Sequence, residues 1–378
     1  MTEAKATVRA AVLTTTGQPL EIRTDVEVSA PHAGEVAVRL AASGVCHSDL
    51  SRARGVIPGL LPMILGHEGA GVVEAVGAGV TGLAVGDHVV ISWVPQCGEC
   101  YWCTHGQPYL CDVAVRASRS SGMLDGTTRA VSQGEELRQM AYSGTFAELT
   151  VVPAISAVKI PNDFPLLLAA LLGCGVLTGV GAALNTADIA PGDTVAVLGC
   201  GGVGLNVIQG ARIADAGEII AIDMHTAKLD LARQFGATQT VDVSIPETDA
   251  VRVIKGLTDG RGADVAFEVI GLAATIHQVV KMTRRGGQSV LVGVPARDVF
   301  LNLEVFADLL LQERTIKACW YGSSDPHRDI PRMVERYRDG TLMLDELVSR
   351  TIDLADVNDA FAVMEGGEVA RSVIDYRR

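Results

Sequence analysis

Residues 194–204 of the chain read TVAVLGCGGVG, an apolar run of strand length that leads directly into a glycine-rich turn. The spacing G-x-G-x-x-G after such a run predicts a strand, a tight turn and a helix in succession. In a turn of this kind the first glycine permits the bend, the second lets the backbone approach a pyrophosphate, and the third lets helix and strand pack closely. The helix start also offers free N–H groups to phosphate. The predicted dinucleotide-binding residues are Gly199, Gly201, Gly202, Val203 and Gly204.

An acidic residue follows at the distance that such a site requires. Asp223 closes the apolar run EIIAID, nineteen residues after Gly204. There its carboxylate would accept hydrogen bonds from the adenosine ribose hydroxyls and would repel a 2′-phosphate, so we expect NAD rather than NADP as the cofactor. Lys228 is near enough in sequence to reach the same ribose. The alternative is an ordinary strand-to-helix turn with Asp223 as a surface cap, but motif, flanking segments and acid agree on the cofactor site.

The segments around this turn repeat its pattern. The strand-length runs EIIAID, TQTVDV, ADVAFEVIG and GQSVLVGV are mostly separated by helix-length segments such as TAKLDLARQFGA. This alternation predicts an α/β architecture with a doubly wound parallel sheet, and TIKACW (315–320) is a candidate sixth strand. The tail beyond Tyr321 contains helix-like DIPRMVERYRDG and strand-like SVIDY, and it could return to the first domain.

The first 160 residues have a different texture. Short runs such as EVAVRLAASG, GAGVVEAVG and DHVVIS are bounded by Gly, Pro and Asp, which is typical of strands. The stretch 116–139 is polar and lacks periodicity, so we expect an ordered loop there. A chain of 378 residues also exceeds the ~250–300 at which a single core stops growing, which favours two domains.

Charge and hydropathy exclude several partners. The net charge of −13 argues against a nucleic acid or an anionic membrane as partner. The first residues, MTEAKATVRA, lack the apolar core of a signal peptide, so we expect a cytoplasmic, reducing location. Residues 164–187 carry no charge and could span a bilayer by length, but they contain four glycines and Asn185. A buried helix with a connecting loop is the expected structure, and no membrane partner is expected.

Half of the eight cysteines lie in one short stretch, CGECYWCTHGQPYLC. CxxC turns deliver pairs of thiolates to one point, and four thiolates can complete the tetrahedral shell of a structural zinc with no position left for substrate. An iron–sulfur cluster, disulfides or a CxxC redox pair are alternatives, which the spacing, the compartment and the absence of a βαβ context disfavour in turn. The predicted ligands of the structural zinc are Cys97, Cys100, Cys103 and Cys111.

Together with GHEGAGVVEAVG (66–77), VGDHVV and LGCGVLTG, these motifs resemble the zinc-dependent medium-chain dehydrogenase/reductase family, and the alcohol dehydrogenases in particular. The resemblance covers essentially the whole chain. It implies a GroES-like β-rich catalytic domain, formed by residues 1–177 and 321–378, and a Rossmann NAD-binding domain, formed by residues 178–320. The structural zinc would lie in a cysteine lobe at about residues 95–113.

The resemblance also assembles a second metal site from distant residues. Cys46 in GVCHSDL, His67 in GHEG and Cys174 in LGCGV match the family's three ligands of catalytic zinc, a set that leaves one position open. Asp49 matches the carboxylate that orients the ligand histidine, and Glu68 matches a glutamate that can approach the zinc. Two zinc ions per chain are therefore expected.

Other positions match residues around the reacting groups. Ser48 matches the hydroxyl that leads the alcohol proton outward, whereas Ser51 stands where many relatives have a histidine as the outer relay, so the route beyond Ser48 is open. The remaining matches are His47 and Arg371 against the pyrophosphate, Thr178 beside the nicotinamide, and Trp93 in the substrate pocket. A tryptophan there would narrow the pocket and favour primary alcohols.

The implied function is the reversible oxidation of mainly primary alcohols to aldehydes, by hydride transfer from a zinc-bound alkoxide to NAD. Two variants remain open. One is a nicotinoprotein in which NAD stays bound, and the other is a thiol-adduct (mycothiol-type) formaldehyde dehydrogenase, in which Arg116 and Arg119 could hold an anionic substrate. A non-catalytic zinc- and NAD-binding sensor is disfavoured by the intact metal set. The segment 299–320 is rich in aliphatic residues near the expected sheet edge, and the resemblance implies that edge strands pair there to form a homodimer or homotetramer.

Overall fold

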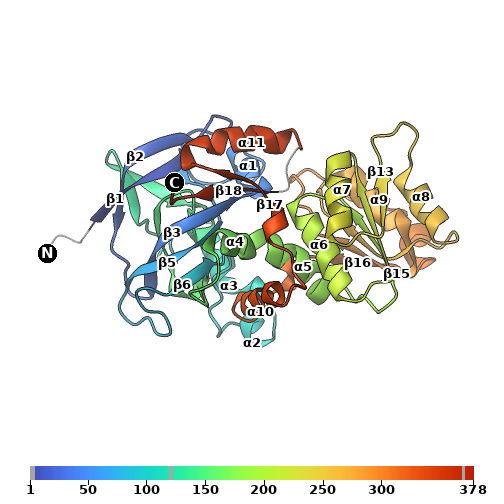
Figure 1. Cartoon of the computed structure of the whole chain (residues 1–378), viewed down its shortest axis with the longest axis horizontal. Helices are drawn as coiled ribbons and strands as arrows, with labels where there is room; N and C mark the ends of the chain where they lie inside the picture. Colours follow the sequence, from blue (N-terminus) through green and yellow to red (C-terminus); the bar gives the residue numbers. More distant parts are fainter. Residues whose placement is uncertain (1–4, 119–121, 368–370) are drawn as a thin grey trace.

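The computed structural model describes residues 5–118, 122–367 and 371–378. Figure 1 shows two halves side by side: a β-rich half that contains both chain ends, and a half built around β13, β15 and β16. The chain passes from the first half to the second and returns with α10, β17, β18 and α11. The tail thus returns to the β-rich half, where β18 pairs with β3.

A small closed barrel forms the outer part of the β-rich half. Its strands pair in the order β1–β2–β7–β8–β4. Two of them come from the polar stretch 116–139, where we expected a loop; that expectation was wrong, because short strands with mixed exposure show no periodicity. The barrel strands are β1 (Lys5–Leu13), β2 (Glu21–Ser29), β4 (Met63–Ile64), β7 (Ala130–Ser132) and β8 (Glu135–Gln139).

A seven-stranded sheet forms the inner part of the same half. The C-terminal strand β18 runs antiparallel to β3, with Ser372 opposite Val45, so the end of the chain completes a sheet that its beginning started. Alternating valines, as in EVAVRL, fill the core between the strands. The strands are β3 (Glu35–Val45), β5 (Glu68–Val76), β6 (His88–Ile91), β9 (Leu149–Pro153), β10 (Ala157–Ile160), β17 (Val348–Ile352) and β18 (Arg371–Asp375).

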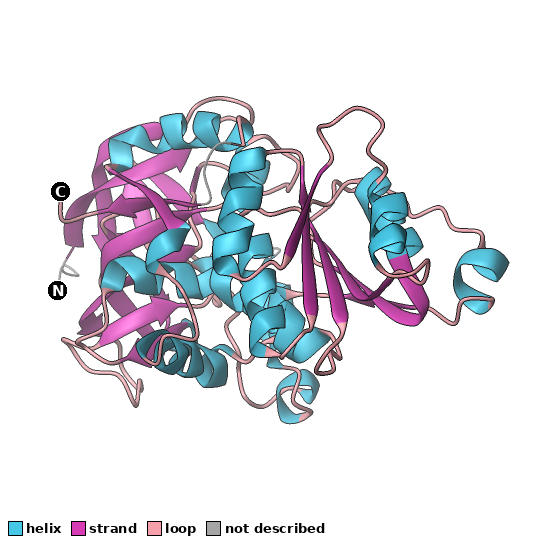
Figure 2. Cartoon of the chain, turned by 45° about the vertical axis from the view of Figure 1, so that its right-hand side comes forward, coloured by secondary structure: helices cyan, strands magenta, loops and turns pink. Residues whose placement is uncertain are grey.

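The predicted Rossmann sheet is present, with all six strands parallel. Their spatial order is β13–β12–β11–β14–β15–β16, which is the doubly wound order with the glycine-turn strand at the centre. Helices cover both faces (Figure 2). The strands are β11 (Thr194–Leu198), β12 (Glu218–Asp223), β13 (Gln239–Asp242), β14 (Ala263–Glu268), β15 (Thr283–Leu291) and β16 (Thr315–Ala318), and the helices are α6 (Gly202–Ile213), α7 (Thr226–Phe235), α8 (Ala250–Leu257) and α9 (Ala273–Met282).

One long apolar helix joins the halves. It runs from Leu166 to Thr186 as α4 (Leu166–Leu171), a π-helical turn (Leu172–Val176), α5 (Leu177–Gly181) and a second π-helical turn (Ala182–Thr186). In the described part of the chain it is the helix long and apolar enough to cross a membrane, but 83% of its most apolar window is buried inside the protein. A buried helix was predicted; the connecting loop was not found, because the glycines continue the helix.

Shorter helices are present in both halves. Local sequence sets their ends: α7 stops at Gly236, whose φ of 116° is the left-handed conformation that suits glycine after a helix. The remaining α-helices are α1 (His47–Ala53), α2 (Tyr101–Thr104), α3 (Asp112–Ser118), α10 (Pro326–Arg338) and α11 (Val357–Glu365). A π-helical segment spans Val305–Leu310, and 3₁₀ turns span Pro108–Leu110, Met140–Tyr142, Ala154–Ser156, Tyr321–Ser323, Asp345–Leu347 and Leu354–Asp356.

A buried ion pair fastens the barrel to the inner sheet. Arg129, just before β7, donates to Glu35 at the start of β3 over 2.5 and 2.8 Å, and both residues are buried. Replacing Arg129 with alanine would leave the Glu35 carboxylate buried without its partner. We expect the free energy of unfolding to fall by about 3 kcal/mol, measured by urea denaturation.

The exposed pair Arg39–Glu74 provides the control for this prediction. Both of its side chains are 43% exposed, so Arg39→Ala should cost less than about 1 kcal/mol. If Arg129→Ala and Arg39→Ala lowered the free energy of unfolding by the same amount, Arg129 would not have the structural role that we assign to it.

Candidate active site

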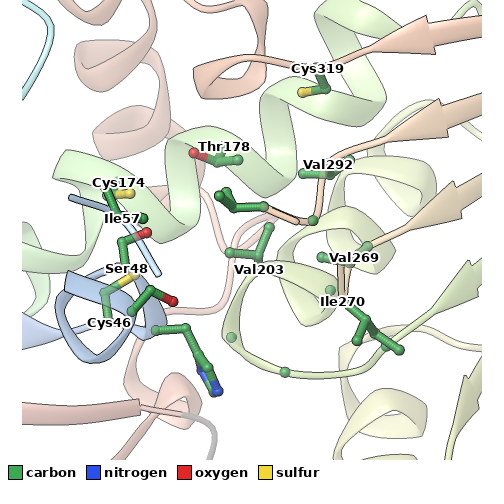
Figure 3. Close-up of a pocket in the computed structure, with 18 of the residues that line it drawn as sticks. Cys46, Ser48, Ile57, Cys174, Thr178, Val203, Val269, Ile270, Val292 and Cys319 are labelled. Atoms are coloured by element: carbon green, nitrogen blue, oxygen red, sulfur yellow. The ribbon is translucent and has the colours of Figure 1, made fainter. Parts of the chain in front are cut away.

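A cavity of about 1260 Å³ lies between the two halves, and residues from both halves line it. Figure 3 shows Cys46, Ser48 and Cys174 on one side of this cavity and Val203, Val269, Ile270 and Val292 on the other. The first group belongs to the β-rich half and the long helix, and the second to the carboxyl ends of the Rossmann strands and the glycine turn. The predicted metal residues and the predicted dinucleotide turn therefore face one space.

Three residues from distant elements meet at the wall of this cavity. Cys46 lies between β3 and α1, His67 lies immediately before β5, and Cys174 lies in the π-helical turn of the long helix. Their ligand atoms, with that of Glu68, all lie within 4.8 Å of one another, and all four residues are buried. We call Cys46, His67 and Cys174 the cavity cluster. Two thiols and an imidazole are donors that zinc prefers.

The orientation of His67 fits a metal ligand. Its Nδ1 lies 2.8 Å from Asp49 Oδ1, and the other Asp49 oxygen accepts from the backbone N–H of Cys46 over 2.9 Å. One carboxylate thus holds the histidine and the first cysteine together. His67 Nε2 is buried and has no hydrogen-bond partner among the residues that the structure describes, so it is the atom available to a metal.

Electrostatics in the cavity cluster favour bound metal. Burial alone would lower the pKa of His67, but the neighbouring Asp49 and Cys46 raise it to about 10. A hydrogen bond from Cys174 lowers the pKa of the Cys46 thiol well below its usual range, and the same interaction raises the pKa of Cys174. The Cys46 thiol thus favours its thiolate form beside a histidine that holds a proton. A divalent cation bound here would displace that proton and take up the negative charge of the thiolate.

Arg371 and Glu68 form a buried ion pair beside the cavity cluster. Arg371 Nη2 donates to Glu68 Oε2, and both side chains are almost fully buried. Glycines make room for them: a Cβ at Gly44 would lie 2.1 Å from Glu68 Oε2, and one at Gly175 would lie 2.9 Å from Arg371 Nη1. Arg371 also lines the cavity, so its predicted contact with a pyrophosphate stays a prediction next to this observed one.

The four cysteines of the cysteine lobe gather as predicted, around the short helix α2. Their sulfur atoms lie within 4.8 Å of one another, and three of the separations are 3.6, 3.9 and 4.0 Å. A tetrahedral zinc with bonds of ~2.3 Å requires sulfur atoms roughly 3.8 Å apart, so the spacing fits. None of these four cysteines lines the cavity in the described part of the chain, as expected of a structural site.

The glycine turn has the geometry that a dinucleotide requires. Gly199 has a φ of 102°, and a Cβ at Gly204 would lie 1.9 Å from the carbonyl oxygen of Gly199. Gly201 instead faces open space and lines the cavity at the start of α6. The three glycines therefore fit the three predicted roles, and the helix start is open to a pyrophosphate.

The other predicted cofactor residues also line the cavity. Asp223 accepts from the backbone N–H groups of Cys200 and His225, over 2.8 and 3.0 Å, and so holds the glycine turn as well as lining the cavity. Burial lowers the pKa of His47. The predicted residues found in the cavity lining are Asp223, Lys228, His47, Thr178, Gly202, Val203, Ser48, Ser51 and Trp93.

Sequence reasoning missed most of the substrate end of the cavity. Side chains near the cavity cluster are largely apolar, and several are half exposed, as wall residues of a binding site are. They come from loops and short helical segments, and no motif marks them as cavity residues. These residues are Ile57, Leu60, Tyr109, Val115, Met140, Val294 and Trp320. Of the two arginines proposed for an anionic substrate, the side chain of Arg116 and all of Arg119 lie outside the described residues.

A third group of potential ligand atoms lies elsewhere, in the barrel. His32, Glu35 and Asp125 come together, but Arg129 donates to both carboxylates. The guanidinium of Arg129 already occupies oxygen atoms of both carboxylates, so we assign no metal to this group.

Comparison with known proteins agrees with this site. Residues 32–162 match the alcohol dehydrogenase GroES-like domain model, and residues 202–339 match the zinc-binding dehydrogenase model. The chain is 42% identical over 371 residues to an S-(hydroxymethyl)glutathione dehydrogenase of Synechocystis sp., covering 97% of this chain and 99% of that one. It is 41% identical to the class-3 alcohol dehydrogenase of Drosophila melanogaster, covering 99% of both chains.

Comparison with solved structures also finds zinc-binding dehydrogenases and alcohol dehydrogenases of the same fold. A benzyl alcohol dehydrogenase from Acinetobacter calcoaceticus superposes with a TM-score of 0.92 at 32% identity, covering 98% of this chain and 99% of that one. An alcohol dehydrogenase zinc-binding domain protein from Burkholderia ambifaria gives a TM-score of 0.93 at 35% identity, with the same coverage.

Fold and site together define a dehydrogenase that combines a metal cluster with a dinucleotide site. The chain belongs to the zinc-dependent alcohol dehydrogenases of the medium-chain dehydrogenase family, oxidoreductases whose cofactors are zinc and NAD. The predicted family, fold class and cofactors are therefore confirmed.

Proposed function

We propose that the protein oxidises primary alcohols reversibly to aldehydes, with NAD as the hydride acceptor. The observation that carries this proposal is the shared cavity: the cavity cluster and the glycine turn face the same space from opposite walls (Figure 3). An alcohol beside the cysteines would thus lie next to the nicotinamide end of a dinucleotide bound at the turn. Such proximity is the main requirement of hydride transfer.

The residues of the cavity cluster would hold the catalytic zinc. When bound there, zinc supplies a Lewis acid that makes an alcohol hydroxyl acidic near neutral pH. Asp49 holds the histidine through Nδ1, which leaves Nε2 as the atom that would bind the metal, and Ser48 lines the cavity beside Cys46, where its hydroxyl would receive the alcohol proton. The apolar lining excludes water from the reacting atoms.

The remaining predicted residues would hold NAD and the second zinc. Gly199, Gly201 and Gly204 would shape the pyrophosphate site, Asp223 and Lys228 would flank the ribose, and Thr178 on α5 would lie beside the nicotinamide. All of these residues line the cavity, which supports these roles. The cysteine lobe would hold a structural zinc. Our proposed division into a catalytic domain (1–177 and 321–378) and a cofactor domain (178–320) agrees with the sheets, since all six Rossmann strands lie between Thr194 and Ala318.

A second candidate substrate comes from the relatives, several of which are named S-(hydroxymethyl)glutathione dehydrogenase. A thiol adduct of this kind is anionic and needs cations or polar groups at the substrate end. Among the described side chains, the substrate end of the cavity offers mainly apolar walls, with Trp93 and Trp320 edge-to-face at 5.2 Å. We therefore place apolar primary alcohols before thiol adducts.

Substrate assays test this function directly. Zinc-replete protein should reduce NAD with butanol or benzyl alcohol, and kcat/KM should exceed that for formaldehyde with glutathione or mycothiol. Preference for the thiol adduct would reverse our order of substrates. Denatured protein should release little NAD(H); near-stoichiometric release would instead indicate a nicotinoprotein that needs an external electron acceptor.

We also propose that the protein forms a homodimer through the edge of the Rossmann sheet. Strand β16 is the edge strand, and exposed apolar side chains precede it, with Phe300 81% and Leu310 69% exposed. A second copy is the partner that continues an edge strand and covers these side chains. A cytoplasmic location, without nucleic-acid or membrane partners, belongs to the same proposal.

Replacing Leu310 with glutamate should disrupt this dimer. A charge buried in an apolar interface is costly, so we expect a shift from dimer to monomer in analytical ultracentrifugation. Val85→Glu, at an exposed position of the β-rich half, is the control. A dimer or tetramer that persists in Leu310→Glu would place the interface elsewhere.

A further inference from the structure

An unusual turn connects the Rossmann sheet to the rest of the chain. After β16, three consecutive residues adopt positive φ values: Tyr321 at 55°, Gly322 at 67° and Ser323 at 47°. Two of these are not glycine, and non-glycine residues adopt this conformation only where surrounding contacts compensate its cost. Those contacts come from the long helix, because a Cβ at Gly322 would lie 2.4 Å from the carbonyl oxygen of Leu177.

The side chain of Tyr321 reaches from this turn to the metal side of the cavity. It is 2% exposed, and its hydroxyl donates a 2.6 Å hydrogen bond to the carbonyl oxygen of Gly173. The phenol oxygen of Tyr321 also lies 3.2 Å from Ser92 Oγ. Burial raises the pKa of Tyr321, so the phenol keeps the proton that it donates.

Both contacts of the hydroxyl are next to residues of the cavity. Gly173 precedes Cys174 in the π-helical turn and has no room for a side chain, since a Cβ there would lie 2.6 Å from the carbonyl oxygen of Ile91. Ser92 precedes Trp93. One phenol therefore ties the turn after β16 to two segments that each present a side chain to the cavity.

The ring of Tyr321 adds a third contact. It lies 4.5 Å from the ring of Trp93, which in turn meets His67 edge-on at 6.5 Å. The indole Nε1 of Trp93 is buried without a hydrogen-bond partner among the described residues, and it approaches the thiol of Cys174. Displacing the tyrosine would therefore move both the tryptophan and the cysteine backbone.

We propose that Tyr321 is a positioning residue for the catalytic zinc site, which fixes Cys174 through the Gly173 carbonyl and Trp93 through its ring. The inference rests on the proposed function in one respect, namely that Cys174 is a zinc ligand. It assigns a direct contact with the metal site to the turn that follows the last Rossmann strand, β16. The end of the cofactor sheet and the geometry of the ligands are coupled through this side chain.

The test compares Tyr321→Phe with Tyr337→Phe in the full-length protein. The first variant removes one oxygen atom and keeps the ring. The second is a matched control, since the Tyr337 hydroxyl donates over 2.8 Å to the exposed Asp345. Neither Tyr337 nor Asp345 is among the described residues that line the cavity. Cobalt is substituted at the catalytic site, and its visible absorption bands report ligand geometry independently of turnover. Zinc content, kcat and KM for butanol are measured on the zinc forms.

Tyr321→Phe should keep two metals per chain, shift the cobalt bands and lower kcat by about 5- to 10-fold, the factor expected from one buried hydrogen bond. The KM for NAD and all properties of Tyr337→Phe should stay unchanged. Cobalt bands identical to those of the unmodified protein would overturn the proposal, even if the melting temperature fell. Should Tyr321→Phe not fold, Ser92→Ala should shift the same bands by a smaller amount, and unchanged bands there would equally overturn it.

These outcomes are separable from a failure of the proposed function. Unmodified protein that holds a single zinc or oxidises no alcohol would refute the function. If the unmodified protein holds two zinc ions and oxidises alcohols, but the cobalt bands of Tyr321→Phe are unchanged, only the role of the tyrosine is refuted.

Discussion

Replacing Cys174 with alanine is expected to lower kcat/KM for primary alcohols by more than about 10³-fold, because the Lewis acid contributes several kcal/mol and each 1.4 kcal/mol is tenfold. Cys174 supplies one of the three ligand atoms of the cavity cluster, all buried and within 4.8 Å of one another. Without it, Cys46 and His67 cannot complete the shell. Metal analysis should show one zinc per chain where the unmodified protein holds two, and NADH formation should fall to background.

Cys103→Ala in the cysteine lobe is the matched control. It also removes one thiol from a four-residue group, but that group is absent from the described lining of the cavity. Its zinc content should likewise fall to one, and its melting temperature should fall, while turnover per folded chain persists. The reverse pattern, with turnover lost in Cys103→Ala and kept in Cys174→Ala, would contradict our assignment of the two sites.

The second large effect is expected at Asp223. In Asp223→Asn the side chain keeps its shape but loses its charge, so the ribose hydroxyls lose a strong acceptor and a 2′-phosphate is no longer repelled. The carboxylate also accepts from the N–H groups of Cys200 and His225, so the glycine turn loosens. We expect kcat/KM for NAD to fall by about 10²-fold, as charge-assisted hydrogen bonds of this kind contribute up to roughly 3 kcal/mol, and the ratio for NADP over NAD to rise.

Asp242→Asn controls for the loss of one surface carboxylate. Asp242 lies opposite Asp223 in the register of β13 and β12, and it accepts from Ser244 rather than facing the cavity. Its NAD kinetics should match those of the unmodified protein. A ratio of NADP to NAD use that stays the same in Asp223→Asn would contradict the predicted role of Asp223.

The parallel sheet could be predicted in detail because its strands are buried on both faces. The interiors of runs such as TVAVL and EIIAID are continuously apolar, and a glycine adjoins each run, Gly199 after the first and Gly217 before the second. The barrel strands β7 and β8 escaped prediction, since β7 has three residues and β8 is polar on its exposed side. The long helix was predicted as buried, but its continuity through four glycines was not.

For the site, sequence motifs predicted ligands and cofactor residues but not the contacts between them. Cys46, His67 and Cys174 are too far apart in sequence for spacing to join them, and only the family resemblance did so before the structure brought them within reach. The ion pair of Arg371 with Glu68 and the hold of Tyr321 on Gly173 involve residues that no motif connects. Such contacts depend on how elements that are far apart in sequence pack together, and no local pattern encodes that packing.

The zinc content of the purified protein tests the central claim most directly. If the cavity cluster and the cysteine lobe each bind one ion, metal analysis of untreated, full-length protein gives two zinc ions per chain. A single zinc that persists in Cys174→Ala, or no zinc at all, would contradict the claim that a catalytic zinc faces the NAD site across this cavity.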